Sequence, residues 1–306
     1  MQGSMSRRGA LLFAAMCVIW GIPYLLIRVA VEELSPAMLV LARTVVAALL
    51  LLPVAAYRRE LRVLLPYWLP VLAFAAIEIA VPWILLGAAE QEISSSLTGL
   101  LIAAVPIVGV VIARTTGARE RLGLQSGIGL LLGLVGVGAI VGVNLEGAGA
   151  VPLAEIGLVA VCYAVGPFVL QRWLSDLPAL GVIAASLALT AIAYLPIAAF
   201  SLPEDRPSAE AIGSTVALAV VCTAVAFLVF FSLIAEVGPV RAALITYVNP
   251  AVAAVLGVAI LDERLTAGMA LGFGLVLVGS VLASRSAPVR RAALDPAYTG
   301  ADATVR

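Results

Sequence analysis

The sequence predicts an all-α integral membrane protein with ten transmembrane helices, arranged as two inverted five-helix repeats. Three observations lead to this prediction. The first is composition: 63% of the 306 residues are hydrophobic and only 12% are charged, whereas charged residues make up about a quarter of a soluble domain. The second is a series of apolar stretches of spanning length, separated by short connections that carry most of the charge. The third is a set of sequence signals that recurs after roughly 140 residues.

Each predicted span is close to the length that a helix needs to cross a bilayer, about 20 mostly apolar residues. No segment alternates apolar and polar residues over the length of a barrel strand. A backbone that must satisfy its hydrogen bonds inside lipid therefore has to be helical. The predicted spans are 10–31, 36–56, 66–89, 95–113, 122–143, 152–171, 178–201, 212–235, 240–261 and 267–284.

The repeat is most visible in a doubled charged motif. Residues 119–122 read Arg-Glu-Arg-Leu and residues 262–265 read Asp-Glu-Arg-Leu, each between a proline-containing span and a glycine-rich one. Pro106 and Pro250, in the preceding spans, are 144 residues apart, whereas the two charged motifs are 143 residues apart. One alignment therefore covers both pairs with a gap of a single residue. The predicted divisions are a first repeat at 10–143, a second repeat at 152–284 and a disordered cytoplasmic tail at 285–306.

The distribution of arginine predicts the orientation. Nearly all arginines lie at one set of span ends, including Arg58 and Arg59, whereas the opposite ends are acidic, as at Glu32 and Glu33. By the positive-inside rule, both termini are cytoplasmic in a plasma membrane. Because five spans per repeat is an odd number, the second repeat is inverted relative to the first, and inverted repeats are typical of secondary transporters.

At this point the chain resembles the EamA family of the drug/metabolite transporter superfamily over residues 10–284. The doubled Glu-Arg-Leu is the most specific of the shared signals. The residues that carry the resemblance are Trp20-Gly21, Arg28, Arg43, Pro106, Glu120-Arg121-Leu122, Asn249-Pro250 and Glu263-Arg264-Leu265. The resemblance implies a ten-helix bacterial inner-membrane protein that exports amino acids and other small metabolites.

Two charged residues lie inside predicted spans and are the main candidates for substrate binding. Glu78 lies about 12 residues, or roughly 18 Å, into the third span, and Arg43 lies in the second span at a similar depth. A charge at that depth is costly and usually faces a cavity or a partner. Glu78 could bind a substrate ammonium or a coupling proton, and Arg43 could bind a carboxylate. The alternatives are a structural ion pair between the two, a Glu78 carboxyl group that is uncharged and merely tolerated, and an Arg43 that ties helices together. The sequence leaves these readings open.

Several polar and aromatic residues near mid-membrane complete the candidate substrate site, although packing explains such aromatics equally well. Asn249 could also bind the backbone carbonyl that Pro250 leaves without a donor. These further candidates are Trp20, Tyr24, Tyr163, Tyr247 and Asn249.

Prolines at matching places in both repeats predict helix breaks that act as hinges of a transporter. The predicted hinges are Pro23, Pro106, Pro167 and Pro250.

Glycines spaced by four residues predict close helix packing in the fifth and tenth spans, as at Gly129 and Gly133. These two spans are predicted to form a pairing or homodimer surface rather than a cavity wall. The Glu-Arg-Leu carboxylates are predicted to stabilise the starts of the same two spans through the helix macrodipole.

The predicted function is therefore a secondary exporter of small polar metabolites, such as amino acids, that works by alternating access. Its partners are the substrate and the lipid bilayer. A net charge of zero argues against nucleic acid. The absence of histidine and of an ATP-binding motif predicts no metal, no cofactor and no enzymatic activity. A facilitative channel or a structural membrane protein is the alternative, and an intramembrane enzyme is a more distant one.

Overall fold

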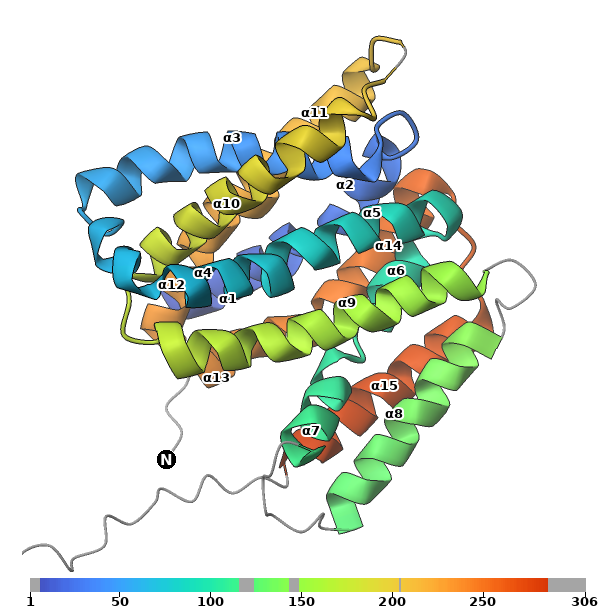
Figure 1. Ribbon diagram of the computed structural model, residues 1–306. Coiled ribbons are helices and arrows are strands. Elements are labelled where there is room, and N and C mark those ends of the chain that lie inside the picture. The colour runs from blue at the N-terminus through green and yellow to red at the C-terminus, as the bar shows by residue number, and fades with distance from the viewer. Residues whose placement is uncertain (1–5, 116–123, 143–148, 204, 286–306) are drawn as a thin grey trace, which may run out of the picture.

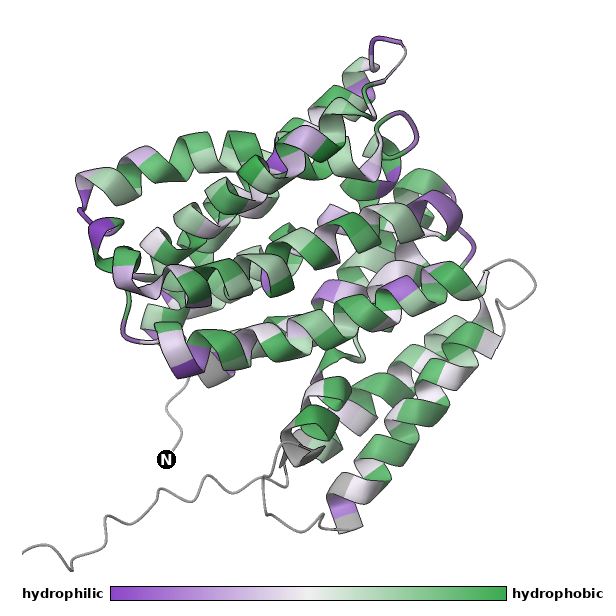
Figure 2. Cartoon of the chain, viewed as in Figure 1, coloured by the Kyte–Doolittle hydropathy of each residue, from purple (hydrophilic) through white to green (hydrophobic). Residues whose placement is uncertain are grey.

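The computed structural model describes residues 6–115, 124–142, 149–203 and 205–285, and all regular structure in these ranges is helical (Figure 1). Eight helical stretches of this part are long and apolar enough to cross a membrane, and two shorter apolar helices accompany them. Apolar residues cover the helices, and hydrophilic ones gather mainly in the connections (Figure 2). The first Glu-Arg-Leu motif, at 120–122, and residues 286–306 of the predicted tail lie outside the described ranges.

The described residues of the first half form ten elements, among them a 3₁₀ helix, η1, and a π-helical segment, η2. In order they are α1 (Arg7–Ile19), α2 (Pro23–Ala30), α3 (Pro36–Tyr57), η1 (Arg62–Tyr67), α4 (Trp68–Phe74), η2 (Ala75–Ala80), α5 (Val81–Glu92), α6 (Ser95–Ile102), α7 (Val105–Thr115) and α8 (Leu124–Gly142).

In the second half, ten elements lie within the described ranges, of which η3 and η4 are π-helical and η5 is a 3₁₀ helix. They are α9 (Ala150–Val169), η3 (Leu170–Leu174), α10 (Ala179–Ala199), α11 (Ala209–Ala219), η4 (Val220–Val225), α12 (Ala226–Val237), α13 (Pro239–Ala242), η5 (Ala243–Tyr247), α14 (Asn249–Leu261) and α15 (Ala267–Arg285).

The four predicted hinge prolines lie at or near irregular backbone. Pro23 is the first residue of α2, while Pro106 and Pro250 are the second residues of α7 and α14. A proline fits the first turn of a helix, because its missing N–H has no partner there. Pro167 differs: α9 continues through it and then passes into η3.

Two π-helical segments interrupt long helices at corresponding places in the two halves. η2 lies between α4 and α5, and η4 lies between α11 and α12, 145 residues later. A π-helical turn inserts one residue into an α-helix and is frequent at functional sites. Here η2 packs against α10, and η4 packs against α3.

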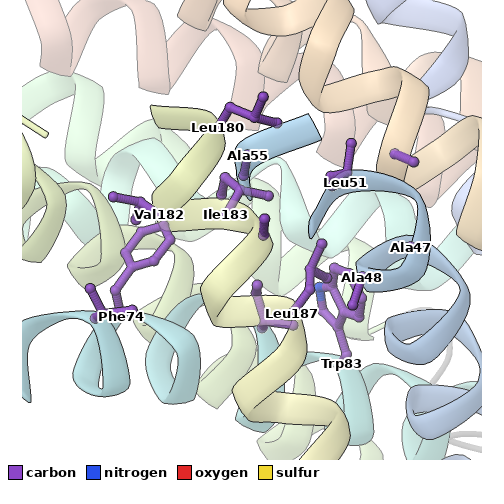
Figure 3. Close-up of a cluster of buried hydrophobic side chains, with 14 of the residues drawn as sticks. Ala47, Ala48, Leu51, Ala55, Phe74, Trp83, Leu180, Val182, Ile183 and Leu187 are labelled. Carbon is purple, nitrogen blue, oxygen red and sulfur yellow. The ribbon is translucent and has the colours of Figure 1, made fainter. Parts of the chain in front are cut away.

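The main contacts join elements of the first half to elements of the second. α3 packs against α10, α5 against α9, α6 against α14, α2 against α11 and α8 against α15. Between α3 and α10, small residues such as Ala47 and Ala48 let Leu187 pack closely beside Trp83 of α5 (Figure 3).

Glycine governs the contact between α8 and α15, which run side by side (Figure 1). A Cβ added at Gly136 would lie 2.6 Å from the carbonyl oxygen of Gly272, and one added at Gly279 would lie 2.5 Å from that of Gly129. The glycine faces of the two helices therefore pack against each other within one chain. Large apolar residues on their other faces are exposed, as at Leu134.

Candidate functional site

Arg43 of α3 is buried and makes two specific contacts. Its Nε donates to the hydroxyl oxygen of Thr223 in η4 at 2.9 Å. Its guanidinium carbon lies 3.6 Å from the ring centroid of Trp83 in α5, the geometry of a cation–π interaction. Arg43 thus holds together three spans from both halves of the chain.

The π-helical geometry of η4 makes Thr223 available to Arg43. The Thr223 hydroxyl donates to the carbonyl of Leu218, five residues earlier, at 2.8 Å. Because the proton is used in that bond, the oxygen accepts from Arg43. Together with Trp83, this bond stabilises a buried cation in a membrane span, and Arg43 is in none of the ion pairs of the described residues.

Glu78 lies in η2, and its Oε2 is buried without a hydrogen-bond partner among the described residues. The same oxygen lies against Gly166 of α9, where an added Cβ would clash with it. Glycine at this position therefore makes room for the carboxyl group. The structural ion pair between Glu78 and Arg43 is not among the ion pairs of the described residues.

Tyr24 of α2 and Tyr163 of α9 lie in the same region. Tyr163 interacts electrostatically with Tyr24, Glu78 and Arg43, and the indole N–H of Trp83 donates to its hydroxyl. Tyr163 is therefore the common neighbour of three other candidates predicted from sequence: a cation, a carboxyl group and a second phenol. Such a set offers complementary partners to a small molecule that carries both charges.

The other three candidates lie around α1 and α14. Trp20 packs on Phe230 of α12 at 4.7 Å between ring centroids. The Asn249 carboxamide, oriented so that its nitrogen faces both carbonyls, donates to Ile245 at 3.0 Å and to Cys17 at 3.1 Å. This side chain links the break before α14 to α1. Tyr247 ends η5, beside the same break.

Several residues of this region were not predicted from sequence. Trp83, Thr223 and Gly166 carry no charge, and each acquires its role only through a contact with a distant part of the chain. The location of Thr223 in a helical interruption that matches η2 is the one signal that could have suggested it. Glu90, at the end of α5, is fully buried.

The second Glu-Arg-Leu motif corrects one prediction. Glu263 does not stabilise the start of its own helix α15. Its carboxylate accepts from the backbone N–H of Ser95 and of Ser96, both at 2.8 Å, and thereby caps α6. Asp262 makes this possible, because its left-handed conformation, with φ of 52°, ends α14 and turns the chain toward α6.

Comparison with known proteins supplies the family context. The model of the EamA-like transporter family matches residues 7–142 and 156–285. The "Uncharacterized inner membrane transporter YedA" of Escherichia coli (strain K12) is 29% identical over 279 residues, 88% of each chain. The "Uncharacterized transporter YvbV" of Bacillus subtilis (strain 168) is 26% identical over 295 residues, 94% of each chain. A solved structure described as "Crystal structure of protein" is similar in fold, with a TM-score of 0.65 and 19% identity over 92% of this chain and 98% of its own.

Proposed function

This chain belongs to the EamA-like transporter family, and from that membership we propose that it is a secondary transporter that exports small polar metabolites by alternating access. Amino acids and related compounds are the proposed substrate class. The observation that carries the proposal is the group formed by Arg43, Glu78, Tyr24 and Tyr163 between the two halves. A substrate carboxylate would bind at Arg43, and a substrate ammonium would bind at Glu78, whose Oε2 has no hydrogen-bond partner in the described part of the chain.

The proposed architecture is ten transmembrane helices in two inverted repeats, with both termini in the cytoplasm of a bacterium and the spans in its inner membrane. It is supported by the pairing of first-half with second-half elements and by the name of the YedA relatives, which are described as inner membrane transporters. Two contacts at opposite ends of the bundle agree with this arrangement. Ser6 binds Glu236 at one end, near Arg7 and Arg8, and Ser208 binds Glu33 at the other.

In the proposed cycle, the two halves rock against each other and open the central group to one side of the membrane at a time. The breaks at Pro23, Pro106 and Pro250, and the π-helical segment after Pro167, would absorb the change in backbone direction. A homodimer stays a prediction. Because the glycine faces of α8 and α15 contact each other, it would have to use their outer, leucine-bearing faces.

The test is counterflow in proteoliposomes. Vesicles loaded with one unlabelled amino acid at a time are diluted into a trace of the same labelled compound. Transient accumulation of label for at least one compound is expected, and Arg43→Ala should abolish it. A channel gives no counterflow, because it does not couple the two directions of movement. Absence of accumulation for all amino acids would contradict the substrate class, and passive equilibration alone would contradict the carrier.

Glu78→Gln tests the role of the carboxyl group separately. This variant keeps the shape of the side chain but cannot bind a proton or pair with an ammonium as an ion. We expect counterflow to be lost or its pH dependence to change. Unaltered kinetics between about pH 5 and pH 8 would remove Glu78 from the transport mechanism.

A further inference from the structure

Glu90 is the most deeply buried carboxyl group among the described residues. It lies in the last turns of α5, its exposed fraction is 0%, and neither carboxylate oxygen has a hydrogen-bond partner in the described part of the chain. An ionised carboxylate in that condition is strongly disfavoured, whereas a neutral, protonated carboxyl group is tolerated. The conformation described by the structure therefore suits the protonated form.

The groups that face Glu90 compensate a negative charge only in part. Arg28 of α2 donates to the backbone carbonyl oxygens of Glu90 and Gln91 rather than to the carboxylate, and it pairs with Glu32 at 3.8 Å. Tyr24, also on α2, is the second titratable neighbour. The third is Glu263, whose own negative charge makes another one beside it less favourable.

The other helices packed against α5 direct their charged groups elsewhere. Arg43 of α3 faces Trp83, and Glu155 of α9 faces Glu92. Among the described residues, Arg28 is thus the main source of positive charge near Glu90, and its guanidinium is already bound to backbone oxygens and to Glu32.

An open cavity of about 260 Å³ lies next to this buried group. Two of the three neighbours of Glu90, Arg28 and Glu263, line the cavity, together with Glu92 and Ser94. A movement of α2, or of the segment after α14 that carries Glu263, away from α5 would therefore join Glu90 to the cavity. Once in contact with water, a glutamic acid ionises at neutral pH, since its usual pKa is about 4.3.

We propose that Glu90 is a proton-binding site of the transport cycle. It holds a proton while the end of the bundle that carries this cavity, here called the mouth, is closed. It releases the proton to water when α2 and the segment with Glu263 move away from α5. The proposal rests on the proposed function in taking this mouth to be the extracytoplasmic one. Only the O–H bond of the carboxyl group breaks, and the proton passes to water or buffer. By linkage, a high pH on this side favours the open mouth, and a low pH favours the closed one.

The experiment measures opening of the mouth directly, without a known substrate. In the full chain with Cys17, Cys162 and Cys222 replaced by alanine, Leu261→Cys places a thiol in the wall of the cavity. Reconstituted protein is labelled with a membrane-impermeant maleimide between about pH 5.5 and pH 8.5. A second protein carrying Leu202→Cys, in an exposed connection, corrects for the intrinsic pH dependence of thiol reactivity.

The corrected labelling rate is expected to rise severalfold with pH in the parent protein and to stay low at all pH values in Glu90→Gln. Glu92→Gln is the matched control, because Glu92 is exposed on the same helix and lines the same cavity; it should leave the rise intact. Equal pH dependence in Glu90→Gln and the parent, or no pH dependence in the parent, would overturn the proposal.

If Glu90→Gln does not fold, Glu263→Gln serves instead. It removes the neighbouring negative charge while its amide oxygen can still accept from Ser95, and it should move the midpoint of the labelling curve to lower pH. An unchanged midpoint would overturn the proposal. Labelling and counterflow are independent, so a pH-dependent mouth in a protein without counterflow would contradict the proposed function but not the proton site.

Discussion

Arg43 Nε and the Thr223 hydroxyl, 180 residues apart in the chain, are joined by a buried hydrogen bond of 2.9 Å. The bond connects α3 to a π-helical segment whose counterpart in the first half, η2, carries Glu78. The two interrupted helices therefore contribute one residue each to the same polar region.

Removing the acceptor in this bond should destabilise the protein. Thr223→Val leaves a buried Arg43 N–H unsatisfied, which costs about 1–3 kcal/mol, whereas Thr223→Ser keeps the bond. Thermal unfolding in detergent measures the difference. Thr190→Val is the control, because the hydrogen bond of that buried hydroxyl among the described residues goes to the carbonyl of Ser186 in its own helix. Equal losses of thermal stability in Thr223→Val and Thr190→Val would mean that the bond to Arg43 contributes no more to stability than a bond within one helix.

Arg43→Lys should lower the affinity for substrate, although the substitution keeps the positive charge. Lysine has no Nε–H in a planar group and cannot both stack on Trp83 and bond to Thr223. Loss of a desolvated cation–π contact, about 2 kcal/mol, corresponds to more than tenfold in an equilibrium constant. Substrate affinity in the counterflow assay is the measurement. Arg58→Lys, in an exposed connection, should behave like the parent, and parental affinity in Arg43→Lys would assign the residue no direct part in binding.

Gly166→Ala should displace the Glu78 carboxyl group, since the new methyl group would occupy the position of Oε2. Overpacking of this kind costs about 1–3 kcal/mol, and counterflow should fall with it. Gly157→Ala on the same helix is the matched control, because nothing lies within 4 Å of a Cβ there. A Gly166→Ala protein with parental stability and transport would show that Glu78 does not depend on this space.

Gly136→Ala should separate α8 from α15. The added Cβ would lie 2.6 Å from a backbone oxygen of Gly272, so the helices must move apart, at a cost of about 1–3 kcal/mol. Thermal unfolding of Gly138→Ala provides the comparison, because Gly138 is on the same helix with open space beside it. Similar melting temperatures for the two variants would contradict the close packing of α8 on α15.

Glu33 should contribute to acid sensitivity. Hydrogen bonds from the Ser208 side chain and backbone lower the pKa of this carboxyl group. Because the folded-state pKa is below the unfolded one, the contribution is present above about pH 4.3 and is lost as the pH falls through the folded pKa. Glu33→Gln should therefore lose less stability than the parent on acidification from about pH 6 to pH 3. Melting curves that fall in parallel, with Glu32→Gln as reference, would exclude this role.

Much of the architecture follows from sequence because lipid imposes simple rules. Spans are readable from length and composition, and Arg43 and Glu78 stand out because charge is costly there. Breaks at Pro23, Pro106 and Pro250 follow from the missing proline N–H. The family membership predicted from the doubled motif and its companions is confirmed.

The remainder depends on contacts that no local pattern encodes. A π-helical segment differs from an α-helix by one residue, too little to register in an apolar span. In the sequence, Thr223 and Trp83 cannot be told from ordinary helix residues. Their role appears only in the folded chain, where both contact Arg43. Glu263 was predicted at the start of α15, yet the left-handed Asp262 turns it to α6.

The glycine contact between α8 and α15 also constrains biogenesis. More than a hundred residues separate the two helices, so α8 leaves the ribosome and enters the bilayer long before α15 is made. During that interval its glycine face can meet only lipid or another nascent segment. Closure of this part of the bundle is therefore a late, post-insertion event, and truncation before α15 leaves α8 without the partner to which its surface is fitted.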